Sequence, residues 1–178
     1  MLIAKNYVLP IYRDVNILKY TTNNPKETKS LGRNLAKMIK SKQKYHSQVI
    51  LLTGDLGAGK TVFVKGLAEG LALDFNITSP TFNLINEYEG NPGLIHMDFY
   101  RIDNKEELIQ LGLEEYLNMN WVKAIEWPQL IFEYINDDFL FIKIVNINED
   151  KREITIKAEG KNSKKLLEGM KANDSTGN

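Results

Sequence analysis

The sequence predicts an α/β fold in three layers, with helices on both faces of a mixed sheet that has parallel strands at its centre and antiparallel hairpins beside them. Three observations support this prediction. The apolar run at residues 49–52 is followed by a glycine-rich turn and then by a helical pattern, which is typical of a strand–loop–helix unit. Two further pairs of apolar runs flank turn residues and predict hairpins. The 178 residues fit one domain with a sizeable core.

The first part of the chain is justified by its capping residues and apolar periodicity. Residues 1–20 are expected to be an N-terminal extension that forms a short strand or an ordered arm. A helix is predicted to begin at Pro25, because Asn24 and Glu27 form a capping-box pattern and apolar residues then recur at helical spacing. Residues 40–48 are polar and predict a loop.

The remainder of the chain is rich in strands. Apolar runs bounded by turn residues predict them at 82–88, 94–100, 121–125, 139–147 and 153–158. The first two and the last two of these strands are expected to form hairpins. A helix over 61–73 follows the glycine-rich turn, and a second is predicted from the capping pair of Asp103 and Glu106 to Leu117. The domain is therefore placed at 21–159, and the tail at 160–178 is expected to be frayed or disordered.

Charge and composition exclude several classes of protein. Lys and Arg number 23 and so do Asp and Glu, whereas a protein that binds nucleic acid by itself usually has a basic excess. The absence of cysteine excludes a disulfide scaffold, a zinc ribbon, an iron–sulfur protein and a thiol enzyme. No apolar run is long enough to cross a membrane and the N-terminus has no secretory pattern, so a cytoplasmic protein with no membrane partner is expected.

The glycine-rich turn matches a phosphate-binding motif. Residues 54–61 read G-D-L-G-A-G-K-T and fit G-x-x-x-x-G-K-[ST] between a buried strand and a helix, as the motif requires. The glycines let backbone N–H groups surround phosphate oxygens, and the helix directs the positive end of its dipole at them. Lys60 is expected to contact the β- and γ-phosphates, and the Thr61 hydroxyl to coordinate Mg²⁺. The pattern predicts nucleotide binding in a P-loop NTPase-type fold.

Two carboxylates end apolar strands. Asp98 follows the run at 94–97, and Glu126 follows the run at 122–125. Strand-terminal residues at the carboxyl edge of an α/β sheet lie beside the loop after the first strand, where ligands bind. Hydrolysis of a nucleotide needs a carboxylate that reaches the metal or the attacking group. Both residues are therefore candidates for catalysis.

Other residues have two interpretations. The hydroxyls in the segment 78–82 contact Mg²⁺ or a phosphate, or they belong to an ordinary Ser-Pro turn. His96 forms a metal pair with Asp98 or has a hydrogen-bond partner within the sheet, and the lack of further ligands favours the second. Trp127 stacks on an adenine or packs in the core, and core packing is favoured. Arg101 pairs with Asp98 or reaches a phosphate.

Four blocks of sequence, taken in this order and spacing, resemble the bacterial TsaE family. They are G-D-L-G-A-G-K-T at 54–61, T-S-P-T-F at 78–82, H-M-D-F-Y-R at 96–101 and I-E-W-P at 125–128. This family is the small P-loop ATPase of tRNA threonylcarbamoyladenosine biosynthesis, and the resemblance extends from about Thr21 to about Glu159.

The resemblance implies roles for individual residues. The loop members implied to bind ATP are Asp55, Leu56, Gly57, Ala58, Gly59, Lys60 and Thr61, of which Lys60 is also assigned to catalysis. Thr61 and Glu126 would ligate Mg²⁺, and Asp98 would be needed for hydrolysis. Three residues outside the loop are also implied to lie at the nucleotide: Thr28, Trp127 and Arg152.

The resemblance also implies partners. The family binds the complex of the threonylcarbamoyl-transferase subunit and its dimerising partner subunit, and its ATP hydrolysis supports repeated turnover of that complex. The tRNA would be contacted only indirectly, through the complex, and low intrinsic activity is expected without the partners. The alternatives are a small-metabolite or nucleotide kinase, which usually has an arginine-rich lid that the scattered arginines here do not supply, and a nucleotide-gated binding module without catalysis.

Overall fold

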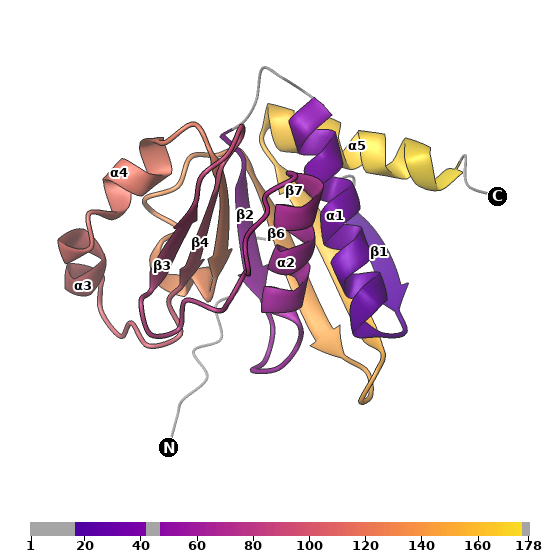
Figure 1. Ribbon diagram of the computed structural model, residues 1–178, viewed down its shortest axis with the longest axis horizontal. Helices are drawn as coiled ribbons and strands as arrows, with labels where there is room; N and C mark the ends of the chain where they lie inside the picture. Colours follow the sequence, from indigo (N-terminus) through magenta and orange to yellow (C-terminus); the bar gives the residue numbers. More distant parts are fainter. Residues whose placement is uncertain (1–16, 42–46, 176–178) are drawn as a thin grey trace.

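A seven-stranded mixed sheet lies between two layers of helices in the computed structural model, which describes residues 17–41 and 47–175 (Figure 1). In spatial order the strands are β1 (Ile17–Thr22), β7 (Arg152–Glu159), β6 (Phe139–Asn146), β2 (Val49–Thr53), β5 (Val122–Glu126), β4 (Leu94–Asp98) and β3 (Ile85–Tyr88). The four strands from β6 to β4 are parallel, whereas β1, β7 and β3 pair antiparallel. The predicted fold class, with a parallel centre and antiparallel hairpins, is confirmed.

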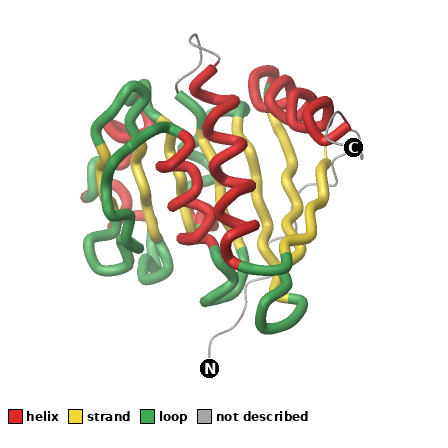
Figure 2. The backbone as a smooth tube through the Cα atoms, turned by 45° about the vertical axis from the view of Figure 1, so that its right-hand side comes forward, coloured by secondary structure: helices red, strands yellow, loops and turns green. Residues whose placement is uncertain are grey.

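The helices cover both faces of the sheet (Figures 1 and 2). One face is packed by α1 (Pro25–Ser41), α2 (Lys60–Gly70) and α5 (Lys161–Ser175). The other is packed by α3 (Lys105–Gln110), α4 (Leu113–Asn118) and a 3-10 helix, η1 (Pro128–Leu130). Within the described part of the chain, no helix is both long enough and apolar enough to cross a membrane.

The first strand–loop–helix unit forms as predicted. β2 is buried along most of its length because it has parallel neighbours on both sides and helices on both faces. α1 begins at Pro25, and the Asn24 side chain accepts a hydrogen bond from the Glu27 N–H at 3.0 Å, as in a capping box. α1 and α2 pack closely, and a Cβ at Gly66 would collide with the Lys29 carbonyl.

The short strand expected within residues 1–20 lies at the end of this segment. β1 begins at Ile17 and pairs with β7 along its whole length, so residues 17–20 are part of the sheet. Residues 1–16, the rest of the expected extension, lie outside the described residues. The predicted loop at 40–48 is too long, because Lys40 and Ser41 complete the last turn of α1; residues 42–46 lie outside the described residues.

The expected frayed tail is a helix over most of its length. α5 extends from Lys161 to Ser175 and buries Leu166, Leu167 and Met170. Asp138 caps its start, since the carboxylate accepts hydrogen bonds at 2.8 Å from the N–H groups of Asn162 and Ser163. Because Asp138 is 23 residues before the start of α5, the sequence of the tail alone does not reveal this cap.

The predicted helix after residue 103 is divided into two short ones. Its N-cap is Asn104 instead of Asp103, because the Asn104 side chain accepts a hydrogen bond from the Glu107 N–H at 3.0 Å. Gly112, with a φ of 67°, separates α3 from α4. β3 begins at Ile85, three residues later than predicted, because Leu84 adopts a left-handed conformation.

Candidate functional site

The glycine-rich loop connects the end of β2 to the first turn of α2. Gly59 is the N-cap of α2 with a φ of 109°, which a residue with a Cβ rarely adopts. Gly54 has a φ of 143°, and a Cβ there would collide with the Ile144 carbonyl of β6. The loop therefore needs glycine at both positions, and it leads directly into the N-terminus of α2, the end of a helix where anions bind.

Lys60 is the first residue of α2, and its side chain folds back over the loop. The Nζ donates hydrogen bonds to the carbonyls of Gly54 at 2.9 Å and Asp55 at 3.0 Å. It also lies 4.4 Å from the centroid of the Trp127 ring. Burial lowers the pKa of the Lys60 ammonium, while the carboxylate of Glu126, and to a lesser degree those of Asp98 and Asp55, act in the opposite direction.

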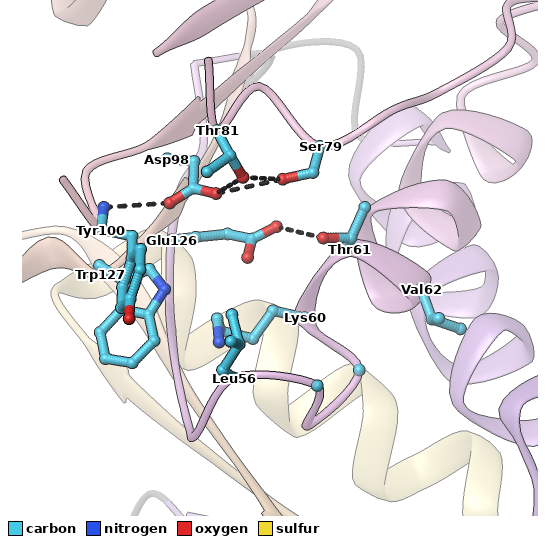
Figure 3. Close-up of a pocket in the computed structure, with 12 residues that line it drawn as sticks. Leu56, Lys60, Thr61, Val62, Ser79, Thr81, Asp98, Tyr100, Glu126 and Trp127 are labelled. Carbon is cyan, nitrogen blue, oxygen red and sulfur yellow. Dashed lines mark hydrogen bonds between the residues drawn. The ribbon is translucent and has the colours of Figure 1, made fainter. Parts of the chain in front are cut away.

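Strand pairing brings the two strand-end carboxylates together. Asp98 and Glu126 are register partners in the parallel pair β4–β5, and both are buried. The Thr61 hydroxyl donates to Glu126 Oε1 at 2.9 Å, so the predicted metal-binding pair is in contact (Figure 3). His96 Nε2 lies 2.9 Å from the same carboxylate oxygen. The favoured interpretation of His96, a strand histidine with a hydrogen-bond partner, describes its place here.

The side chains of Ser79 and Thr81 lie beside the Asp98 carboxylate (Figure 3). Asp98 Oδ2 accepts hydrogen bonds from the Ser79 hydroxyl at 3.1 Å and the Thr81 hydroxyl at 2.7 Å. Asp98 Oδ1 accepts a third, from the Tyr100 N–H at 3.0 Å. The sequence allowed two interpretations for the hydroxyls of Ser79 and Thr81. In the structure they donate hydrogen bonds to the Asp98 carboxylate.

These side chains line one pocket of about 210 Å³. Its lining residues are Leu56, Gly57, Gly59, Lys60, Thr61, Val62, Ser79, Thr81, Asp98, Tyr100, Glu126 and Trp127. Trp127 has a φ of 56°, unusual for a residue with a side chain, and its ring centroid lies 5.0 Å from that of Tyr100. Trp127 thus belongs to the pocket wall, not to the core as favoured from sequence. Tyr100 and Val62 are lining residues that the sequence did not single out.

Some of the expected site residues lie beside the pocket. Thr28 is buried behind the loop, where its hydroxyl contacts that of Thr22 at 2.8 Å and its methyl faces Gly59. Arg152 approaches the loop from β7 and donates to the Ala58 carbonyl at 3.4 Å.

Two further side chains point away from the expected partners. The Asp55 side chain is exposed and is absent from the pocket lining, although its carbonyl accepts from Lys60. Arg101 lies over the Phe82 ring at 4.5 Å and contacts this exposed aromatic side chain instead of Asp98.

The donor atoms at the pocket fit Mg²⁺ and a nucleotide. Mg²⁺ prefers oxygen ligands and is usually held by one or two carboxylates together with substrate phosphates and water. The Thr61 hydroxyl and the Glu126 carboxylate are in contact at the start of α2, beside the loop and Lys60. Among the described residues there is no group of three or more His, Cys, Asp or Glu side chains that could hold a metal ion. A metal at this pocket would therefore take its remaining ligands from phosphate and water.

Comparisons of the sequence and of the structure with known proteins point to the same family. Residues 22–154 match the family model described as threonylcarbamoyl adenosine biosynthesis protein TsaE. The tRNA threonylcarbamoyladenosine biosynthesis protein TsaE of Bacillus subtilis is 41% identical over 162 residues, which cover 90% of this chain and 98% of that protein. Its namesake in Rickettsia typhi is 37% identical over 142 residues, covering 79% and 94%.

A solved structure is similar over the same extent. The crystal structure of YdiB from Bacillus subtilis superimposes with a TM-score of 0.71 and 37% sequence identity, and the match covers 92% of this chain and 99% of that one. The family model spans most of the chain, and the curated relatives match it over nearly their full length. This chain therefore belongs to the TsaE family.

Proposed function

We propose that this protein is a Mg²⁺-dependent ATPase that acts in the biosynthesis of threonylcarbamoyladenosine in tRNA. Family membership supports the pathway. The main structural support for the chemistry is the hydrogen bond between the Thr61 hydroxyl and the Glu126 carboxylate, because it joins the end of the phosphate-binding motif to a strand-end acid.

Different residues of the pocket would have different roles in the reaction. Backbone N–H groups of the loop and the start of α2 would bind the β- and γ-phosphates, and the Lys60 ammonium would leave the carbonyls of Gly54 and Asp55 to contact them. Thr61 and Glu126 would hold Mg²⁺, which supplies neutralisation of charge on the phosphates when bound. Asp98, which accepts hydrogen bonds from two hydroxyls at the same pocket, would act on the attacking water.

We assign to this chain the binding of the threonylcarbamoyl-transferase complex and the hydrolysis of ATP that supports its repeated turnover. The net charge of zero supports a division in which this chain handles ATP and the partner proteins hold the tRNA.

The test is ATP hydrolysis by the purified chain with and without the transferase subunit and its partner subunit. Lys60→Ala and Glu126→Ala should each abolish the partner-dependent hydrolysis, because they remove a phosphate contact and a metal ligand. Lys65→Ala is the matched control, since Lys65 is an exposed lysine on the same helix. Circular dichroism should show an unchanged fold in all three variants.

Three outcomes would contradict the proposal. Wild-type hydrolysis in Lys60→Ala or Glu126→Ala would remove the site from the reaction. Transfer of the γ-phosphate to a nucleoside or sugar would identify a kinase instead; of the arginines in the described residues, none lines the pocket. Nucleotide-dependent association without phosphate release would identify a binding module.

A further inference from the structure

We propose that His96 is a positioning residue for Glu126. Its Nε2–H donates a hydrogen bond to Glu126 Oε1 and so fixes the carboxylate. The other oxygen of Glu126 is turned into the pocket, on the side of Lys60 (Figure 3). The inference rests on the proposed role of Glu126 as a metal ligand and adds a residue that the pocket does not expose.

The burial of His96 supports this role. The side chain is fully buried, and its Nδ1 has no hydrogen-bond partner among the described residues. A buried polar atom without a partner costs stability, and an apolar side chain of similar size would avoid that cost. The imidazole is therefore not explained by packing, and the contact that it makes is the one with Glu126 Oε1.

The same contacts define which ring nitrogen bears the proton. Glu126 Oε1 is a carboxylate oxygen, so the nitrogen that faces it at 2.9 Å must be the donor. A proton on Nδ1 instead would leave a buried N–H without an acceptor and would place two lone pairs against each other. The structure therefore assigns a proton to Nε2.

The strand register allows the imidazole to reach Glu126. His96 and Asp98 point to the same face of β4, and their register partners on β5 are Ala124 and Glu126. Because Ala124 has only a methyl group, it leaves room beside His96 for the ring to extend along β5 to the next residue on that face.

The hydroxyl of Thr61 donates to the same oxygen as His96. Thr61 is also a proposed metal ligand, so its hydroxyl has two tasks. His96 is fully enclosed and has no access to the pocket, because it is absent from the pocket lining. It thus remains available to hold the Glu126 carboxylate whatever the Thr61 hydroxyl binds.

The experiment compares His96→Leu, which removes the donor, with His96→Gln, whose amide can donate from a similar position. ATP affinity is measured with Mg²⁺ and with EDTA, and partner-dependent hydrolysis is measured alongside. His96→Leu should weaken Mg²⁺-dependent ATP binding and lower kcat by about 10- to 100-fold, the usual effect of removing a hydrogen-bond partner from a metal ligand. Affinity in EDTA should stay unchanged because the loop is intact. His96→Gln should recover most of the loss.

Two controls separate the possible failures. Met97→Ala, a buried change on the opposite face of β4, reports the effect of lost packing and should leave the Mg²⁺ dependence unchanged. If Glu126→Ala keeps the Mg²⁺ dependence, the proposed function of the pocket fails. If Glu126→Ala loses it and His96→Leu keeps it, the inference about His96 alone is overturned.

A spectroscopic measurement on the wild-type protein covers the case in which His96→Leu does not fold. Nitrogen-15 NMR of the imidazole should show a protonated Nε2, with the Nε2 resonance shifted in Glu126→Ala. A bare Nε2 in the wild type would also overturn the inference.

Discussion

Replacing Lys123 with Met should change the pH dependence of stability. Lys123 lies on β5 and is fully buried, and its Nζ donates hydrogen bonds to the Ser47 hydroxyl at 2.7 Å and to the Met119 carbonyl. Burial lowers the pKa of this ammonium from 10.5 to about 8. In the unfolded chain the pKa returns to its ordinary value, so folding disfavours the charged form.

The direction in which stability changes with pH follows from the order of the folded and unfolded pKa values of Lys123. Below about pH 8 the lysine is charged in both states, and the full penalty of burying the charge opposes folding. As pH rises from about 8 to 10.5 the folded chain loses its proton first, so the wild type becomes more stable. The shift corresponds to about 3 kcal/mol in all, of which about 2 kcal/mol would be regained between about pH 7 and 9.5.

Urea unfolding of wild type and Lys123→Met at several pH values measures this effect. The difference in unfolding free energy between the two proteins should move in favour of the wild type by about 2 kcal/mol over that interval. Other lysines titrate in both proteins and cancel in the difference. A difference that stays constant with pH would refute the reasoning and would mean that Lys123 is no harder to charge in the folded chain than in the unfolded one.

Three further substitutions test other features. Asp138→Ala should destabilise the protein by about 1 kcal/mol in urea unfolding because α5 loses its cap, whereas Asp137→Ala at the exposed neighbouring position should have little effect. Thr81→Val should lower ATP hydrolysis about tenfold, because Asp98 loses a hydrogen bond worth roughly 1.5 kcal/mol; an unchanged rate would show that this hydroxyl is dispensable. Gly66→Ala should lower the unfolding free energy by about 1 to 3 kcal/mol, since it forces α1 and α2 apart, and a neutral result would mean that the helices adjust freely.

The centre of the fold and the placement of the main candidate residues at one pocket could be predicted because their signals are local. A buried strand, a glycine-rich loop and a helix follow one another directly, and the carboxyl ends of parallel strands meet at one edge of a sheet. Asp98 and Glu126 therefore lie at the loop as expected, although 27 residues separate the strands' last residues in the chain.

The parts that sequence reasoning missed depend on distant contacts. The start of α5 follows Gly160 and is capped by Asp138, so no capping residue marks it locally. β1 is an edge strand with a weak pattern, and its pairing with β7 could not be inferred from either segment alone. The contact between His96 and Glu126 likewise depends on the register of β4 and β5, which the residues of one strand do not reveal.

Because Asp98 and Glu126 are register partners, the distance between them does not depend on the segment that joins β4 to β5. Adjacent strands lie about 4.8 Å apart, and this spacing sets the separation of the two acids whatever the length of the connection between β4 and β5. That connection passes through α3 and α4 on the face of the sheet opposite α2. Doubling the length of a flexible loop costs only about 0.6 kcal/mol. The junction at Gly112 between α3 and α4 is therefore a place where a tag or a small domain could be inserted without disturbing the spacing of the carboxylates.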